Sequence, residues 1–155
     1  MGTKTVKLED FSKVLKDFTS LTLKEQQAGV ASGLARSIPD LVAASPVDTG
    51  LYASSWDYTV DEKKAVLGNY APHAPIIESG ARPFTPPIGP LLAWAKRVLK
   101  SSSQPPDYDS EVWGLAKGTQ KKIAEQGMKP RHVLENTLPI IIENIRQELK
   151  RVGGQ

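Results

Sequence analysis

The 155-residue chain contains no cysteine and only two histidines. Without thiols it forms neither disulfides nor the common cysteine-containing zinc sites, and thiolate catalysis is excluded. The histidines, His73 and His132, do not share a helical face and show no HExxH-type spacing, so we expect no metal site. Aromatic residues make up only 6% of the chain, and no apolar run approaches the length of a membrane span.

Charge and length set further limits. A net charge of +3 and a pI near 9.1 are mild, and fall short of the concentrated basic stripe of a nucleic-acid-binding protein. The chain has the usual length of a single domain. Its first residues lack the apolar core of a signal peptide, so we expect assembly in the cytoplasm.

The motifs of common enzymes are also missing. No serine lies in a GxSxG elbow. The glycines at 29 and 33 fall inside a predicted helix with no strand before them, so they do not form a phosphate-binding loop. The triplet Asp48-Thr49-Gly50 resembles that of aspartic proteases, but the second carboxylate and its flanking strands are absent, and a turn is the better interpretation. We therefore predict no enzymatic activity and no cofactor.

The first half of the chain predicts a helix and a β-hairpin. Thr22 and Glu25 form a capping box at the start of a helix over residues 23–43, and Pro39 is expected to end or kink it. Residues 51–69 predict the hairpin, whose first strand has an aromatic face of Tyr52, Trp56 and Tyr58. That face is expected to be core or a subunit interface, with base stacking as the less favoured alternative.

The second half combines a proline-rich segment with three helices. A short helix should begin at Pro75 and end before Gly80, and an extended loop should cover residues 82–89. The main helices are expected from Pro90, over residues 109–125, and at the C-terminus, where Pro139 either lies in the first turn or kinks a longer helix. The glycines at positions 114 and 118 should each destabilise the helix over residues 109–125 by about 1 kcal/mol unless a neighbour packs closely against them.

The order of these features resembles a known family. It runs from Pro46-Val47-Asp48-Thr49-Gly50-Leu51 through Gly68-Asn69-Tyr70-Ala71-Pro72, Glu78-Ser79-Gly80-Ala81-Arg82-Pro83, Pro86-Pro87-Ile88-Gly89-Pro90 and Gly127-Met128-Lys129-Pro130-Arg131. This order is similar to that of the minor tail and tail-completion proteins of long-tailed bacteriophages, which are neck or head–tail joining components. The resemblance covers roughly residues 23–149. It does not include the amphipathic segment from Leu8 to Phe18, and Leu51-Tyr52 replaces basic residues often found after the turn.

Pattern and resemblance together predict an α+β fold. A small antiparallel β-hairpin or sheet should pack with several helices, including a long helix in the N-terminal half and a C-terminal helix. We expect an amphipathic extension over residues 1–20, one α+β domain over residues 21–150, and a disordered tail over residues 151–155.

The resemblance implies a structural virion protein. It would lie at the head–tail junction of the particle and form a homo-oligomeric ring, which the resemblance suggests is a hexamer. It would contact connector, head-closure, tail-terminator or tail-tube proteins, with DNA passing through the lumen. The alternatives are a tail-terminator ring that caps the tube, and a DNA-binding accessory protein. The expected interface residues are Tyr52, Trp56, Tyr58, Arg82, Phe84, Ile88, Lys121, Lys122 and Arg131.

Overall fold

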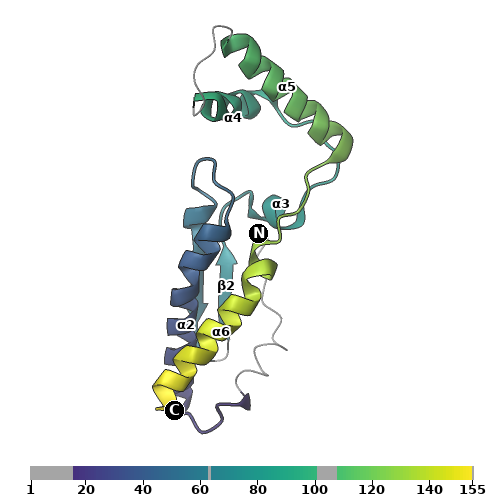
Figure 1. Cartoon of the computed structure of the whole chain (residues 1–155). Helices are drawn as coiled ribbons and strands as arrows, with labels where there is room; N and C mark the ends of the chain where they lie inside the picture. The colour runs from purple at the N-terminus through teal and green to yellow at the C-terminus, as the bar shows by residue number, and fades with distance from the viewer. Residues whose placement is uncertain (1–15, 63, 101–107, 155) are drawn as a thin grey trace. The chain divides into compact units, whose positions relative to one another are not determined.

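The computed structural model describes residues 16–62, 64–100 and 108–154 (Figure 1). Over these residues it contains five α-helices and one two-stranded antiparallel sheet, which confirms the small α+β fold. The chain divides into two compact units. Unit 1 comprises Met1–Glu78 and His132–Gln155, and unit 2 comprises Ser79–Arg131. Most of the expected helix from Leu8 to Phe18 falls outside the described residues.

The first long helix of unit 1 is α2 (Leu23–Ala44). Its capping box is present as predicted, because the Thr22 hydroxyl accepts the Glu25 amide and the Glu25 carboxylate accepts the Thr22 amide. The Thr22 hydroxyl also donates to the Glu25 carboxylate, and this bond together with the one from the Thr22 amide lowers the pKa of Glu25. The helix continues through Pro39, which lies on its exposed side. Water can therefore donate a hydrogen bond to the backbone carbonyl group that loses its amide donor at the proline.

The hairpin is shorter than predicted. A 3₁₀ turn, η1 (Ala53–Ser55), precedes β1 (Trp56–Val60), which pairs with β2 (Ala65–Asn69). The predicted strand start at residue 51 is wrong, because Ser54 and Ser55 bond back to Gly50 and Leu51 and close local turns. Tyr52 therefore lies in a turn, outside the strand.

Unit 1 is completed by two further helices, α3 (Ala74–Ser79) and α6 (Val133–Gly153). The longer alternative for the C-terminal helix is correct, and Pro139 again lies on an exposed side. The helix runs to Gly153, so residues 151–153, expected in a disordered tail, are helical. Lys150 and Arg151 suit the negative end of the helix dipole.

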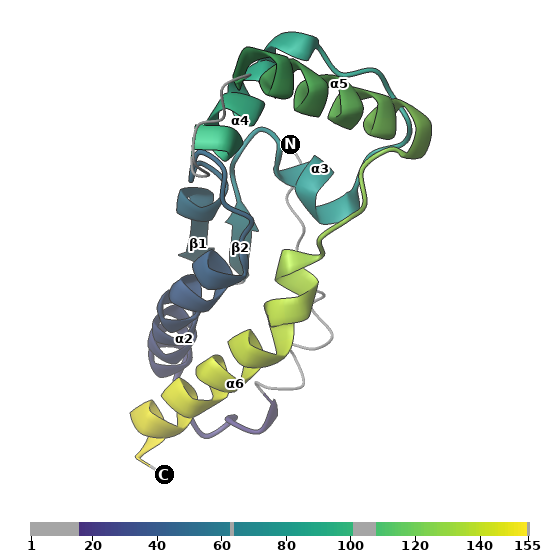
Figure 2. The ribbon, with the colours of Figure 1, turned by 45° about the horizontal axis from the view of Figure 1, so that its top comes forward.

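Helices α2 and α6 lie side by side in both views of the ribbon (Figure 1, Figure 2). Two glycines of α2 make this approach possible. A methyl group at Gly33 would lie 2.4 Å from the Ile145 Cα atom, and one at Gly29 would lie 2.7 Å from the Leu149 side chain. The main core forms around this helix pair. Its largest fully buried side chains are Leu41, Ile141 and Leu149.

Unit 2 consists of two helices and their connecting segments. These are α4 (Ile88–Lys100) and α5 (Tyr108–Gln126). The segments at its two ends meet in a β-bridge between Ala81 and Met128. Gly80 and Gly127 flank the bridge with φ of 72°, and a side chain on either would collide with the opposite backbone.

Candidate interaction surfaces

The predicted aromatic face is mostly core. Tyr52 and Trp56 are 3% and 7% exposed, and their rings meet edge to face at 5.6 Å. The Trp56 indole donates a hydrogen bond to the Ser45 hydroxyl. Tyr58 is half-buried against the same core. Because Tyr52 and Trp56 are withdrawn from solvent, they do not offer an interface or a base-stacking platform, and the core interpretation is the one that fits.

Beneath Tyr52 lies a buried carboxylate that the sequence analysis did not single out. Glu78 of α3 is 5% exposed and accepts the Tyr52 hydroxyl at 2.5 Å. The same carboxylate accepts the Leu134 amide in the first turn of α6, at 3.3 and 3.4 Å. Its own carbonyl accepts the His132 amide. Burial and the hydrogen bond to Glu78 raise the pKa of Tyr52 far above its usual value.

Glu78 therefore caps α6 from a distant part of the sequence. His132, the residue before this helix, has a left-handed φ of 51° and makes no side-chain cap. A free helix amide needs an acceptor, and an acid near a helix N-terminus is favoured by the helix dipole. The chain leaves unit 1 after Glu78 and returns to it at His132. The hydrogen bonds of Glu78 to Leu134 and His132 therefore connect the two points at which the chain leaves and re-enters the unit. No local sequence pattern predicts this contact, because Glu78 and Leu134 are 56 positions apart in the sequence.

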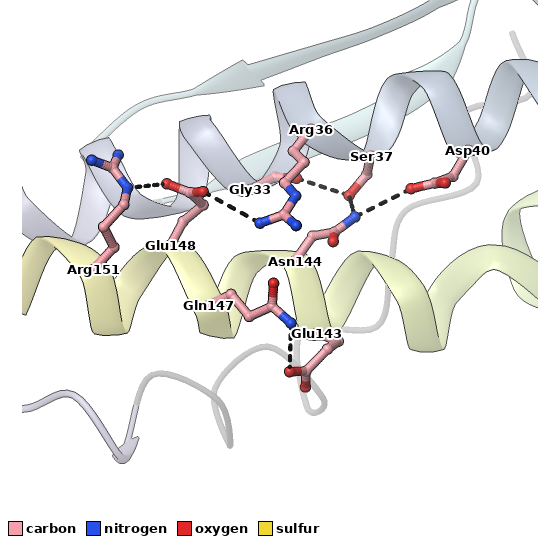
Figure 3. Close-up of polar contacts among 9 residues, drawn as sticks. All are labelled: Gly33, Arg36, Ser37, Asp40, Glu143, Asn144, Gln147, Glu148 and Arg151. Atoms are coloured by element: carbon pink, nitrogen blue, oxygen red, sulfur yellow. Dashed lines mark hydrogen bonds and ion pairs between the residues drawn. The ribbon is translucent and has the colours of Figure 1, made fainter. Parts of the chain in front are cut away.

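A second polar cluster lies between α2 and α6 (Figure 3). The Asn144 amide group donates to the Ser37 hydroxyl at 3.0 Å and to the Asp40 carboxylate at 3.3 Å. Ser37, which is fully buried, donates to the Gly33 carbonyl at 2.8 Å. These bonds satisfy the polar groups that the helix contact buries, which makes the cluster structural.

The cluster continues toward the end of α6 as surface ion pairs (Figure 3). Glu148 contacts Arg151 at 2.7 Å and Arg36 at 3.7 Å. Both arginines are exposed, so these pairs contribute little to stability. Nothing in this arrangement positions a nucleophile or a general base.

The other six expected interface residues belong to unit 2. Arg82 and Phe84 are exposed in the loop before α4, and Phe84 is 41% exposed. Ile88 is half-buried against the α4–α5 contact. The loop does not extend freely, since Pro86 is buried and its carbonyl accepts the Gln120 side-chain amide of α5. The predicted loop is therefore packed against its own unit at Pro86 and exposed on either side of it.

The predicted basic residues follow α5 and the segment after it. Lys121 and Lys122 are exposed, and Lys121 lies 3.9 Å from Glu125. Arg131 is also exposed, at the end of unit 2. An exposed tryptophan, Trp113, precedes them on the helix, and the Lys117 ammonium group lies 5.9 Å from its ring centroid.

Unit 2 has a thin core. Among its described residues, the buried hydrophobic cluster consists of Ala95, Val112 and Ala116, with half-buried side chains around it. Two large apolar residues of its helices stay exposed, Trp113 at 48% and Val98 at 41%. Val98 is exposed because the contact with α5 uses other residues of α4, including Leu92, Ala95 and Leu99. The exposure of Trp113 was not predicted from the sequence, although this residue lies outside the helical row that contains the buried Val112 and Ala116.

Charge is also distributed unevenly between the units. Unit 2 contains nine Lys and Arg against four Asp and Glu, a net charge of +5. The rest of the chain contains eleven against thirteen, a net charge of −2. The overall net charge of +3 is therefore the sum of a basic unit 2 and a slightly acidic unit 1. A positive net charge of this kind lowers the electrostatic cost of approaching a negatively charged surface.

The described residues contain no group of three His, Asp or Glu side chains that could hold a metal ion. Among the helices of the described ranges, none is both long and apolar enough to span a bilayer. Searches of family models, curated proteins and solved structures gave no match to this chain.

Proposed function

We propose that this chain is a structural virion protein of a long-tailed bacteriophage, a neck component that joins head to tail or completes the tail end. It acts by binding copies of itself in a ring and by binding adjoining virion proteins, without catalysis. The proposal starts from the order of turns and helices between Pro46 and Arg131, which resembles the tail-completion family.

The observation that carries the proposal is the incomplete core of unit 2. In the described part of the unit, the two helices bury three hydrophobic residues fully, and two of these are alanines, so the apolar burial between the helices is small. Phe84, Val98 and Trp113 remain exposed on the same unit. Large exposed apolar side chains on a small unit favour a protein-binding role, because contact with a partner would remove them from water.

A knockout in the encoding phage tests the proposal. Without the protein, heads and tails should accumulate separately, and adding the purified protein should join them into infectious particles. The double substitution Phe84→Ser with Trp113→Ser should abolish this joining while circular dichroism stays unchanged, since both side chains are exposed. The control is Tyr70→Ser, which removes an aromatic side chain that is 57% exposed on unit 1. Infectious particles that assemble normally without the protein would refute the proposal.

The net charge of unit 2 favours one second candidate, a DNA-binding accessory protein. In that case the isolated protein should bind duplex DNA tightly in a gel-shift titration. Its affinity should fall steeply as salt rises, because phosphate contacts release counterions. Weak binding, or binding that does not respond to salt, would rule this candidate out.

A further inference from the structure

The outer face of α5 has a pattern that is complementary to itself. The side of this helix facing α4 contains Val112 and Ala116. Five residues follow the opposite side at alternating steps of three and four: Glu111, Gly114, Gly118, Lys121 and Glu125. All five are exposed, and we call this row the α5 seam. A step of three and four is the spacing of residues that meet a facing helix.

The charges of α5 are unevenly distributed along its length. Asp109 and Glu111 lie in its first half and Lys117 lies at its midpoint, whereas Lys121, Lys122 and Glu125 lie in its second half, so the first half is net negative and the second half is net positive. Its net charge is zero, with three acidic and three basic residues, although unit 2 as a whole is basic. Two such helices repel each other when parallel, since like charges then meet. They attract each other when antiparallel.

The glycines of the α5 seam fit the same arrangement. A methyl group on Gly114 or Gly118 would meet nothing within 4 Å. When Gly114 of one copy faces Gly118 of a second, Glu111 of each copy lies opposite Lys121 of the other. The two glycines are four positions apart, as are Gly29 and Gly33 of α2, against which α6 packs. The chain thus already contains one helix pair of this kind.

We infer that α5 binds α5 of a second copy in an antiparallel, two-fold contact through the α5 seam. The self-complementary charge order identifies the partner as another copy of this chain. A two-fold contact closes on itself, so it joins two copies and leaves ring contacts to other surfaces. The inference does not rest on the proposed function, because it concerns the purified protein.

Charge reversal tests the contact in solution. Glu111→Lys and Lys121→Glu each turn two attractions into two repulsions, and each should weaken the dimer by about tenfold or more. The double variant Glu111→Lys with Lys121→Glu restores both pairs and should dimerise like the wild type. An equimolar mixture of the two single variants should also dimerise, as a heterodimer. Sedimentation velocity at increasing protein concentration measures each case.

The absence of native cysteine allows a test of the register. A chain with Glu111→Cys mixed with a chain with Lys121→Cys should crosslink through a short bismaleimide. Either variant alone should not, because its two cysteines would lie about 15 Å apart along the helices. A wild-type protein that stays monomeric at about millimolar concentration would overturn the inference. Oligomers unchanged by the reversals, or equal crosslinking by one variant alone, would also overturn it.

Discussion

Substitution of Gly33 by alanine probes the close contact of α2 and α6. The added methyl group would lie 2.4 Å from the Ile145 Cα atom and 2.8 Å from its amide nitrogen. Both are backbone atoms, so neither can move away by a change of rotamer. Relief requires the two helices to separate, which also stretches the hydrogen bond between Asn144 and Ser37.

The expected cost follows from two opposing effects. Overpacking a tight core site costs about 1–3 kcal/mol, and a strained buried hydrogen bond adds about 1 kcal/mol. Alanine regains about 1 kcal/mol through its better helix propensity. We therefore expect Gly33→Ala to lower the free energy of unfolding by about 2 kcal/mol, which corresponds to about 4–8 °C in Tm for a chain of this size.

Urea denaturation followed by circular dichroism measures the change, and α5 offers a matched control. Gly118→Ala makes the same substitution inside a helix, but nothing lies within 4 Å of its new methyl group. It should stabilise α5 by about 1 kcal/mol. The measurement belongs at low protein concentration, where the proposed dimer is dissociated. A Gly33→Ala protein as stable as the wild type, or more stable, would refute the reasoning about the helix contact.

Substitutions at three further positions test the polar contacts of unit 1. Thr22→Ala removes the capping hydroxyl of α2 and should cost about 1 kcal/mol in thermal unfolding; no loss would mean that the cap contributes nothing. Asn144→Asp should lower the free energy of unfolding in urea more than Asn144→Leu does, since it places a second carboxylate beside Asp40. The reverse order would contradict the contact between Asn144 and Asp40. The folded protein keeps the Tyr52 proton that the unfolded chain loses above a pH of about 10, so stability should fall there by about 1.4 kcal/mol per pH unit. Tyr52→Phe, which also removes the donor to Glu78, should abolish that part of the alkaline decline, and an unchanged slope would exclude Tyr52 as its source.

Local patterns predicted the elements of the fold well. The capping box at Thr22, the short helix before Gly80 and the helix predicted over residues 109–125 depend on residues close in sequence, and all three are present. The predicted start of the first strand at residue 51 was wrong because the alternation at Tyr52 and Trp56 also fits a turn followed by a strand. Short aromatic runs do not distinguish these cases.

Long-range contacts could not be predicted. The contact of Glu78 with Tyr52 and Leu134 spans separations of 26 and 56 residues, and no local spacing encodes it. The glycine pair at 29 and 33 was correctly placed in a helix, but its role in packing depends on α6, more than one hundred residues away. Exposure of Trp113 depends on how thinly unit 2 is packed, which a helical wheel alone does not give.

The central claim is that this protein acts by joining virion parts. The most direct measurement mixes separated heads and tails from a knockout phage with the purified protein and counts infectious particles by plaque assay. We expect the titre to rise with added protein and the protein to be found at the head–tail junction of the joined particles. Heads and tails that join equally well without it, in particles that do not contain it, would contradict the claim.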